Sequence, residues 1–497
     1  MNKYVCATIL ATTLVLTSTT GCGLMVVNDL SGENILLHNK NIVTGETSVP
    51  KETETVTPFT PYVEADRDTQ IERYLSELPA MTFDGAAVFI TSPSFSYLEP
   101  DTLDTPVSQE AYERNRMLEE RYAISLSTSV RDGSTMLVEL QNAVASGSYY
   151  SDLLMIPLYM MGQFKTGAVL ENLRSLPYLD LDKTYFHQSS VDVLSAGFTT
   201  WGVAGYASVS PSDLTAVFMN KDVIGNAMLD LPYDLVNDGD WTWDAFYTYV
   251  QAVQTMNANG GSFYTVTAQN PASRLADLVF ISCDNKYVLS GEKLIPAISY
   301  TAESAAPAVD YASRIFGDEK SITDPSAGAI GCFSRGESLF LIDYTYVTTW
   351  LTNASVDWGL LPLPKLTEAG KHQTLVSNTT LCFGVPAGTV NTELSSVLLS
   401  AINGASWEVL NDAYVEHSMI YTLRDNDSVN MLDMILDTAA FDFALAFGTS
   451  YPNMAAGTYQ LIREAAAAGS ISADFDAKTS KANMILAEHF PMEITNE

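Results

Sequence analysis

The sequence predicts an α/β fold with largely parallel sheets. In the first half of the chain, short apolar runs alternate with charged or amphipathic stretches at the spacing of strands and helices. The length of 497 residues corresponds to two or three domains, at about 150 residues each. Apolar residues make up 47% and charged residues 17%, which is enough for sizeable cores and excludes a mainly disordered chain.

Five elements in order establish this pattern. Strands are expected at 86–91, 124–130 and 152–156, and helices at 109–122 and 135–145. The first strand reads AAVFIT, a continuous apolar run that is typical of a strand buried on both faces of a sheet. Strands joined by helices in this way form right-handed βαβ units with parallel neighbours.

The order of elements is less regular in the second half. A strand is expected at 338–342, which reads SLFLI, and a helix at 243–256 with Asp240 or Thr242 as its N-cap. Further helices are expected at 66–78, 301–316, 391–403, 406–416, 427–447, 457–468 and 478–490.

The N-terminus has the layout of a secretory signal. Lys3 gives a short positive region, and the apolar stretch 5–16 is too short to span a bilayer. Residues 19–22 read TTGC and resemble the cleavage box of bacterial lipoproteins, although Thr stands where that box usually has Leu. We therefore expect residues 1–21 to be a lipoprotein signal peptide.

Cys22 is the expected lipidation site, and a diacyl anchor there holds a protein stably at a membrane surface. Residues 44–62 are rich in Thr, Glu, Ser, Pro and Val, which is typical of a tether. We expect 22–80 to be a lipid-anchored tether with a short helix at its end. The rest of the chain would then lie at the extracellular face of the bacterial cell membrane; a plain secreted protein is the alternative.

The charge balance argues against one class of partner. The chain has 25 Lys and Arg against 59 Asp and Glu, a net charge of −34. Binding to nucleic acid depends on cationic side chains that release counterions, so no nucleic-acid partner is expected.

No catalytic, cofactor or metal motif is found. Nucleophile-elbow, zinc-protease, P-loop and dinucleotide patterns are all missing, so we expect no enzyme activity and no cofactor. Carboxylate pairs for glycoside cleavage stay open, because their separation is a property of the fold. Cys283, Cys332 and Cys382 stand singly and are expected to be buried free thiols, although a disulfide is not readable from the sequence.

Five segments carry a resemblance to a known family. They are residues 86–124 with Tyr122-Ala123-Ile124, residues 150–154 (YSDLL), residues 201–221 with WGVAGY and AVFMNK, residues 241–246 (WTWDAF), and residues 333–365 with FSRGESLF and WGLLPLPK. In this order they resemble the extracellular solute-binding proteins of ABC transporters, in particular the sugar-binding family that includes maltose-binding protein. Ala123 stands where that family usually has Gly.

The resemblance covers about 83–490 and implies a two-lobed periplasmic-binding-protein-like fold. Each lobe is a mostly parallel sheet flanked by helices, with a hinge between the lobes. The expected lobe one is 83–210 plus 365–430, and the expected lobe two is 215–357 plus 431–497. Crossings between the lobes are expected near 208–216, 358–366 and 425–435.

The resemblance also implies a function. A monomeric receptor would bind a small solute, with a mono- or oligosaccharide as the leading candidate, in the interlobe cleft and deliver it to an ABC permease. A surface lipoprotein with a degenerate cleft, acting as adhesin or sensor, is one alternative. A receptor for an amino acid, peptide or polyamine is another.

A sugar receptor needs aromatic platforms for CH faces and polar groups for hydroxyls, and Tyr and Trp supply both. The candidate ligand-binding residues are taken from the family's motif positions: Tyr344, Tyr346, Asp343, Trp201, Tyr206, Ser208, Ser210, Asn378, Trp350 and Asp152. For each of them the competing interpretation is packing, a helix cap or a solvated strand end. Trp241 and Trp243 are expected to be structural.

Overall fold

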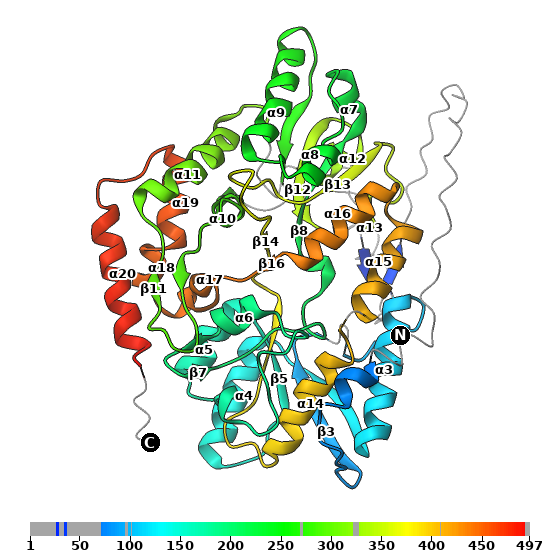
Figure 1. The fold of residues 1–497 in the computed structure, drawn as a ribbon, viewed down its shortest axis with the longest axis vertical. Helices are drawn as coiled ribbons and strands as arrows, with labels where there is room; N and C mark the ends of the chain where they lie inside the picture. Colours follow the sequence, from blue (N-terminus) through cyan, green and yellow to red (C-terminus); the bar gives the residue numbers. More distant parts are fainter. Residues whose placement is uncertain are drawn as a thin grey trace, which may run out of the picture. The chain divides into compact units, whose positions relative to one another are not determined.

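Two four-stranded sheets form the framework of residues 58–497 in the computed structural model (Figure 1). The structure describes residues 26–28, 34–36, 71–94, 98–100, 102–268, 272–321, 328–407 and 409–492. The predicted signal peptide, Cys22 and most of the predicted tether lie outside these residues. Among the described helices, none has the length and apolar character needed to cross a membrane.

The segment before residue 58 is a separate unit. Its described part is an antiparallel pair of short strands, β1 (Val26–Asn28) and β2 (Asn34–Leu36).

The first sheet confirms the predicted βαβ pattern. Its strand order is β15-β5-β3-β4, with β3 at Ala86–Ser92, β4 at Ile124–Val130 and β5 at Leu153–Pro157. These three strands are parallel, and β15 (Leu381–Gly384) adds an antiparallel edge next to β5. All five side chains of β5 are buried. The burial on both faces that was predicted for 86–91 is wrong for the first part of β3, where Ala87 and Phe89 are exposed.

Local capping sets the helices that connect these strands. Helix α3 (Pro106–Tyr122) begins three residues earlier than predicted, because Thr105 caps it in a capping box with Ser108. It ends at Ala123, whose φ of 48° is the left-handed conformation that favours glycine. The next helix, α4 (Gly133–Ser146), is capped by Asp132.

The second sheet is mixed rather than mostly parallel. Its order is β13-β8-β12-β9, with β8 at Thr215–Asn220, β9 at Tyr264–Thr267, β12 at Ser338–Tyr344 and β13 at Trp358–Leu361. Only β12 and β9 are parallel; β8 runs antiparallel to both of its neighbours. Only β12 was predicted as a strand from the apolar pattern of the sequence.

Helix α9 (Trp243–Ala258) has Thr242 as its N-cap, as predicted. Trp241 and Trp243 are fully buried. Their indole N–H groups donate to the Pro362 carbonyl and to Ser282 Oγ, both at 3.0 Å. These contacts join α9 to β13's end and to α10 (Ala272–Ser282) and show the predicted structural role.

The remaining elements are helices and short strand pairs. The helices are η2 (Leu158–Met160), α5 (Met161–Thr166), η3 (Leu173–Ser175), α6 (Gln188–Val193), η4 (Pro211–Asp213), α7 (Lys221–Asn226), α8 (Tyr233–Asp238), α11 (Ala302–Gly317), α12 (Ala329–Ser334), α13 (Val347–Leu351), α14 (Thr392–Gly404), α15 (Val409–Tyr421), η6 (Gly448–Ser450), α18 (Pro452–Ala456), α19 (Tyr459–Ala468) and α20 (Phe475–His489). The short strand pairs are β6 (Ser195–Ala196) with β7 (Thr199–Thr200), and β10 (Val288–Leu289) with β11 (Ala297–Ile298).

The single helix predicted at 427–447 is wrong. Helix α16 (Asn426–Asp437) is followed by strand β16 (Ala439–Ala440), which pairs in parallel with β14 (Thr374–Leu375). A new helix, α17 (Phe443–Phe447), then starts because the Asp442 carboxylate caps it at Ala444 N–H. A tertiary strand pairing has thus overridden the helical pattern of the sequence.

Three segments that connect the two sheets lie side by side. Leu214 pairs with Val376 in a β-bridge, and β14 pairs with β16. The Ser377 N–H also donates to the Asp213 carbonyl at 3.1 Å. The chain returns to the first sheet through 374–380, which is C-terminal to the crossing expected near 358–366, because 358–361 is strand β13.

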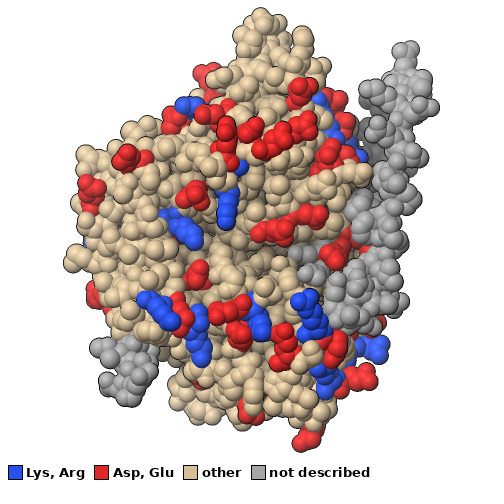
Figure 2. Space-filling view, viewed as in Figure 1, with Lys and Arg blue, Asp and Glu red and all other residues tan. Residues whose placement is uncertain are grey.

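Apolar packing differs on the two faces of the first sheet. One face, covered by α14, has its own cluster with Val88, Leu153 and Phe383. The other face belongs to a cluster that continues through Phe443 and Phe447 into the second sheet. The surface drawn in Figure 2 carries more acidic than basic side chains, with uncharged residues over most of its area.

Candidate ligand-binding site

The carboxyl end of β12 carries four of the predicted site residues. Asp343 is buried, and one of its carboxylate oxygens accepts the Tyr344 N–H at 2.7 Å. The rings of Tyr344 and Tyr346 lie 6.2 Å apart, and Trp350 packs edge-on against Tyr346 at 5.3 Å. We call Tyr344, Tyr346 and Trp350 the aromatic cluster. Trp350 is 60% exposed, so this cluster opens to solvent.

Backbone pairing fixes the position of the cluster. Strand β12 pairs with β8 up to Tyr344, and the Tyr346 N–H then donates to the Ser212 carbonyl at 3.0 Å. Helix α13 begins at Val347, so Trp350 lies one helical turn after Tyr346. The rings therefore stand on a strand end and a helix start that are held by the sheet.

Asp213 is a site residue that the sequence analysis missed. It lies in η4, directly before β8, and is half-buried. Burial raises the pKa of its carboxyl to about 6, since desolvation disfavours the charged form. Burial also raises the pKa of the Tyr346 hydroxyl to about 12, with further contributions from Asp343, Tyr344 and Asp213. The aromatic cluster therefore lies in the field of two carboxyl groups.

The first sheet reaches the same place through the segment 374–380. The Ser377 N–H bonds to Asp213, and the Asn378 carbonyl accepts the N–H of Tyr159 at 3.0 Å. Tyr159 follows β5 at its carboxyl end. A continuous series of backbone hydrogen bonds thus links Tyr346 to Tyr159. Asn378, a predicted site residue with an exposed side chain, lies within this series.

Ser210 and Ser208 make local structural contacts. Ser210 caps η4 by accepting the Ser212 N–H at 3.2 Å, next to Asp213. Ser208 is buried, and its hydroxyl exchanges hydrogen bonds with the backbone of Gly205. The position of Ser210 keeps it beside the site, whereas the Ser208 hydroxyl is occupied by its own turn.

The other predicted residues have different surroundings. Trp201 packs edge-on against Phe447 and Phe490, with ring centroids at 5.6 and 5.7 Å. Tyr206 stacks on His187 at 4.9 Å. The structure therefore places these two rings among packing partners rather than beside the aromatic cluster.

Asp152 lies at the other end of its strand. It is buried and accepts hydrogen bonds from the Phe89 N–H at 2.9 Å and the Tyr149 hydroxyl at 2.6 Å. Asp152 precedes β5, whereas Tyr159 follows it, so the five residues of the strand separate them by roughly 17 Å. Its bonding fits a strand-end anchor.

Comparison with known proteins identifies the fold. No family model matches the chain, and no curated protein does. Solved structures do match. The GacH receptor of Streptomyces glaucescens, described unliganded and with acarbose or an acarbose homolog, is 13% identical and covers 82% of this chain and 98% of its own, with a TM-score of 0.51.

Two further structures agree with this match. A cyclic alpha-maltosyl-1,6-maltose binding protein from Arthrobacter globiformis is 14% identical over 81% of this chain and 100% of its own, with a TM-score of 0.56. An ABC substrate-binding protein from Listeria monocytogenes, in complex with cycloalternan, is 12% identical over 82% and 99%, with a TM-score of 0.50. The fold is that of sugar-binding ABC substrate-binding proteins.

In this two-lobed fold, each of the two four-stranded sheets is the framework of one lobe. We call the part built on β15-β5-β3-β4 lobe one and the part built on β13-β8-β12-β9 lobe two. The residue boundaries of the lobes stay a prediction. At identities of 12–14% the likeness concerns the fold, so ligand and partners are argued below as proposals.

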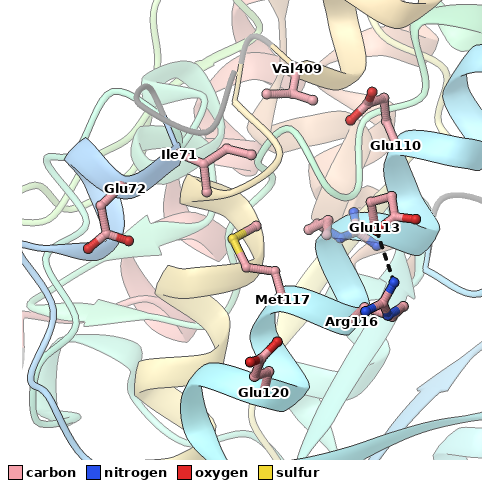
Figure 3. A pocket seen from close by; sticks show the side chains of 9 residues that line it. Ile71, Glu72, Glu110, Glu113, Arg116, Met117, Glu120 and Val409 are labelled. Atoms are coloured by element: carbon pink, nitrogen blue, oxygen red, sulfur yellow. Dashed lines mark hydrogen bonds and ion pairs between the residues drawn. The ribbon is translucent and has the colours of Figure 1, made fainter. Parts of the chain in front are cut away.

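A hollow on the outside of lobe one is a competing location. It has a volume of about 350 Å³ and lies between the helical residues 71–75, α3 and the start of α15 (Figure 3). Its walls carry Glu110, Glu113 and Glu120, and Glu113 pairs with Arg116 at 3.5 Å. It contains none of the candidate ligand-binding residues, and it touches one lobe only. We therefore place the candidate site at the end of β12.

Among the described residues, no group of three or more His, Cys, Asp or Glu side chains could hold a metal ion. Cys283, Cys332 and Cys382 are free and buried, as predicted. The only sequence signal for Asp213 was its place in the turn Ser210-Pro211-Ser212 before an apolar run. The backbone around Asp213 pairs with a distant part of the chain: Leu214 forms a β-bridge with Val376, and the Ser377 N–H donates to the Asp213 carbonyl.

Proposed function

We propose that this protein is the extracellular substrate-binding component of an ABC importer and that it binds a mono- or oligosaccharide. The observation that carries the proposal is the aromatic cluster with Asp213 and Asp343, placed where backbone hydrogen bonds join the two lobes. The predicted signal peptide and the predicted lipid anchor at Cys22 would hold this receptor beside its permease.

The chemistry of the site suits a sugar. A pyranose presents apolar CH faces that stack on aromatic rings, and a rim of hydroxyls that donate to carboxylates. The partly exposed rings of Tyr344, Tyr346 and Trp350 supply surfaces on which the CH faces would stack, and the Asp213 carboxylate would accept hydrogen bonds from the hydroxyls. Asn378, on the lobe-one side, adds an amide with both donors and an acceptor.

The fold supplies the mechanism. A ligand that contacts both lobes stabilises the closed arrangement by its differential affinity for that state. The segments 211–215 and 374–380 are the backbone about which the lobes would turn. The permease would then recognise the closed form.

A thermal-shift screen tests the proposal. Glucose, maltose, maltotriose and cyclic glucans would be compared with amino acids, peptides and polyamines. A true ligand at a hundred times its dissociation constant stabilises the protein by about 2.7 kcal/mol. Tyr346→Ala should lose the shift, and Tyr178→Ala, at an exposed tyrosine elsewhere, should keep it. An adhesin or sensor with a degenerate cleft would show no shift with any solute, and a glycosidase would release reducing ends.

One observation favours a second ligand class. Burial alone is the cause that raises the Asp213 pKa, with no neighbouring cation lowering it among the described residues. A ligand ammonium group would offset that desolvation, and aromatic rings attract cations. Spermidine and putrescine are therefore the decisive non-sugar members of the screen. Their stabilisation of the protein, with none by sugars, would replace the saccharide proposal.

A further inference from the structure

Residues 489–491 contact lobe one. Lys165 of α5 donates from its ammonium group to the His489 carbonyl at 2.6 Å and to the Tyr451 hydroxyl at 3.2 Å. The same ammonium lies 4.3 Å from the centre of the Phe490 ring and 5.7 Å from that of Trp201. Such contacts combine charge-assisted hydrogen bonds with cation–π attraction.

Phe490 fills an aromatic pocket. It is 2% exposed and meets Phe443 at 4.9 Å, Tyr451 at 5.3 Å and Phe447 at 5.4 Å between ring centroids. Trp201 closes the pocket at 5.7 Å. We call Trp201, Phe443, Phe447, Tyr451 and Phe490 the tail pocket. A large apolar side chain held this way resists removal because its whole surface would return to water.

The next contact is a close backbone approach. Gly197 has a φ of 57°, and a Cβ atom placed on it would clash with the Pro491 carbonyl oxygen. Only a residue without a side chain permits this approach. The same turn, between β6 and β7, also donates from Gly197 N–H to the Leu294 carbonyl and from Phe198 N–H to the Glu292 carbonyl, at 3.1 and 2.6 Å.

The other end of this segment belongs to lobe two. Asn483 of α20 accepts the Ile298 N–H of β11 at 2.8 Å. Helix α20 also packs on α18, which continues into α19. Arg463 of α19 bonds to the buried Asp277 of α10 at 3.0 Å. Figure 1 shows α18, α19 and α20 together along one flank, next to α11 and β11.

We propose that residues 475–491 form a strap between the lobes, which passes outside the hinge segments and limits the range of lobe angles that the protein samples. Its body is fixed to lobe two through α18 and β11, and its end is fixed to lobe one through Lys165, Trp201 and Gly197. Release of the end from lobe one therefore widens the distribution of distances between the lobes. The proposal concerns the protein without ligand and does not depend on the proposed sugar specificity.

Pulsed electron spin resonance on the full chain tests the strap. Spin labels are attached through a keto-bearing unnatural amino acid at positions 138 and 228, so the natural cysteines are not labelled. Val138 lies on α4 in lobe one and Met228 follows α7 in lobe two, and they are 57% and 93% exposed. Lys165→Met and Gly197→Ala are compared with the unsubstituted chain.

The matched control is Gly147→Ala. Gly147 also has a positive φ, of 66°, but nothing lies within 4 Å of an added Cβ, so this variant carries the backbone strain without the clash. We expect a broader interlobe distance distribution in Gly197→Ala and Lys165→Met and an unchanged one in Gly147→Ala. Distributions as narrow as that of the unsubstituted chain in both strap variants would overturn the proposal. If Gly197→Ala does not fold, a chain that ends at Glu488 decides the question by the same measurement.

Discussion

The aromatic cluster and the tail pocket use the same kinds of side chain for opposite purposes. In the aromatic cluster, Trp350 is 60% exposed and the neighbouring charges are carboxyl groups. In the tail pocket, Phe447 is fully buried and the neighbouring charge is the Lys165 ammonium. The difference teaches that an aromatic group is available to a ligand only where the protein leaves its ring faces uncovered.

Burial acts on the charges of both regions in the same sense. It raises the pKa of the Asp213 carboxyl and lowers the pKa of the Lys165 ammonium, so in each case it favours the neutral form. Lys165 already has two hydrogen-bond acceptors from the chain. A ligand hydroxyl or ammonium group would likewise donate a hydrogen bond to the Asp213 carboxylate.

The largest expected effect is a difference in stability between variants of the two regions. Phe447→Ala should lower the free energy of unfolding by about 3–5 kcal/mol, because it leaves a cavity in a fully buried pocket. Trp350→Ala should change it by less than about 0.5 kcal/mol, because most of that ring is in water already. Urea unfolding followed by circular dichroism measures both. Equal losses would mean that Trp350 is a core residue and not a ligand platform.

The second effect concerns binding. Tyr346→Ala should weaken the affinity for the ligand found in the screen about tenfold, which is about 1.4 kcal/mol, since one stacking surface is lost. Trp201→Leu should leave the dissociation constant within about a factor of two, because its ring faces the tail pocket. Isothermal titration calorimetry gives both values. A larger loss for Trp201→Leu would restore Trp201 as the ligand contact that its motif position predicts.

The smallest expected effect is a pH dependence at Asp213. Its folded-state pKa of about 6 is above the ordinary 3.8, so the folded protein retains a proton that the unfolded chain releases in this window. Stability is therefore lost as pH rises from about 4 to about 6 and stays lower above that. Asp213→Asn cannot ionise and does not lose this contribution. The melting temperature of the variant, relative to that of the unsubstituted protein, should therefore rise as the pH increases across this window.

Two comparisons isolate that effect. Asp442, whose pKa burial raises to about 7, gives the same trend in both proteins and cancels in the difference. The exposed Asp182→Asn serves as control and should show a constant difference at every pH. A constant difference for Asp213→Asn as well would mean that its carboxyl is solvated and does not belong to the site.

The elements that local patterns define were predictable from the sequence. The runs at 86–91 and 338–342 are strands whose apolar residues pack in a sheet, and Thr242 caps α9 because its hydroxyl reaches the Ala245 N–H. The family motifs also placed Asp343 and the aromatic cluster at one strand end. These are properties of neighbouring residues in the chain.

What depends on distant partners was not predictable. The helix expected at 427–447 is interrupted because β16 pairs with β14, and Trp201 packs because Phe490 arrives from the other end of the chain. Asp213 is half-buried only because Ser377 and Tyr346 bond to its turn. No periodicity or spacing encodes such contacts. The sequence alone therefore could not distinguish an aromatic residue available to a ligand from one that packs against other side chains.

The burial of Phe490 has a consequence for the order of assembly. The rest of its pocket is formed by Trp201 and by α17, which precede it in the chain, and the pocket stays open to water until Phe490 docks. Contacts between such distant parts of a chain form slowly. We therefore expect the flank of the molecule next to α20 to be the last part to consolidate.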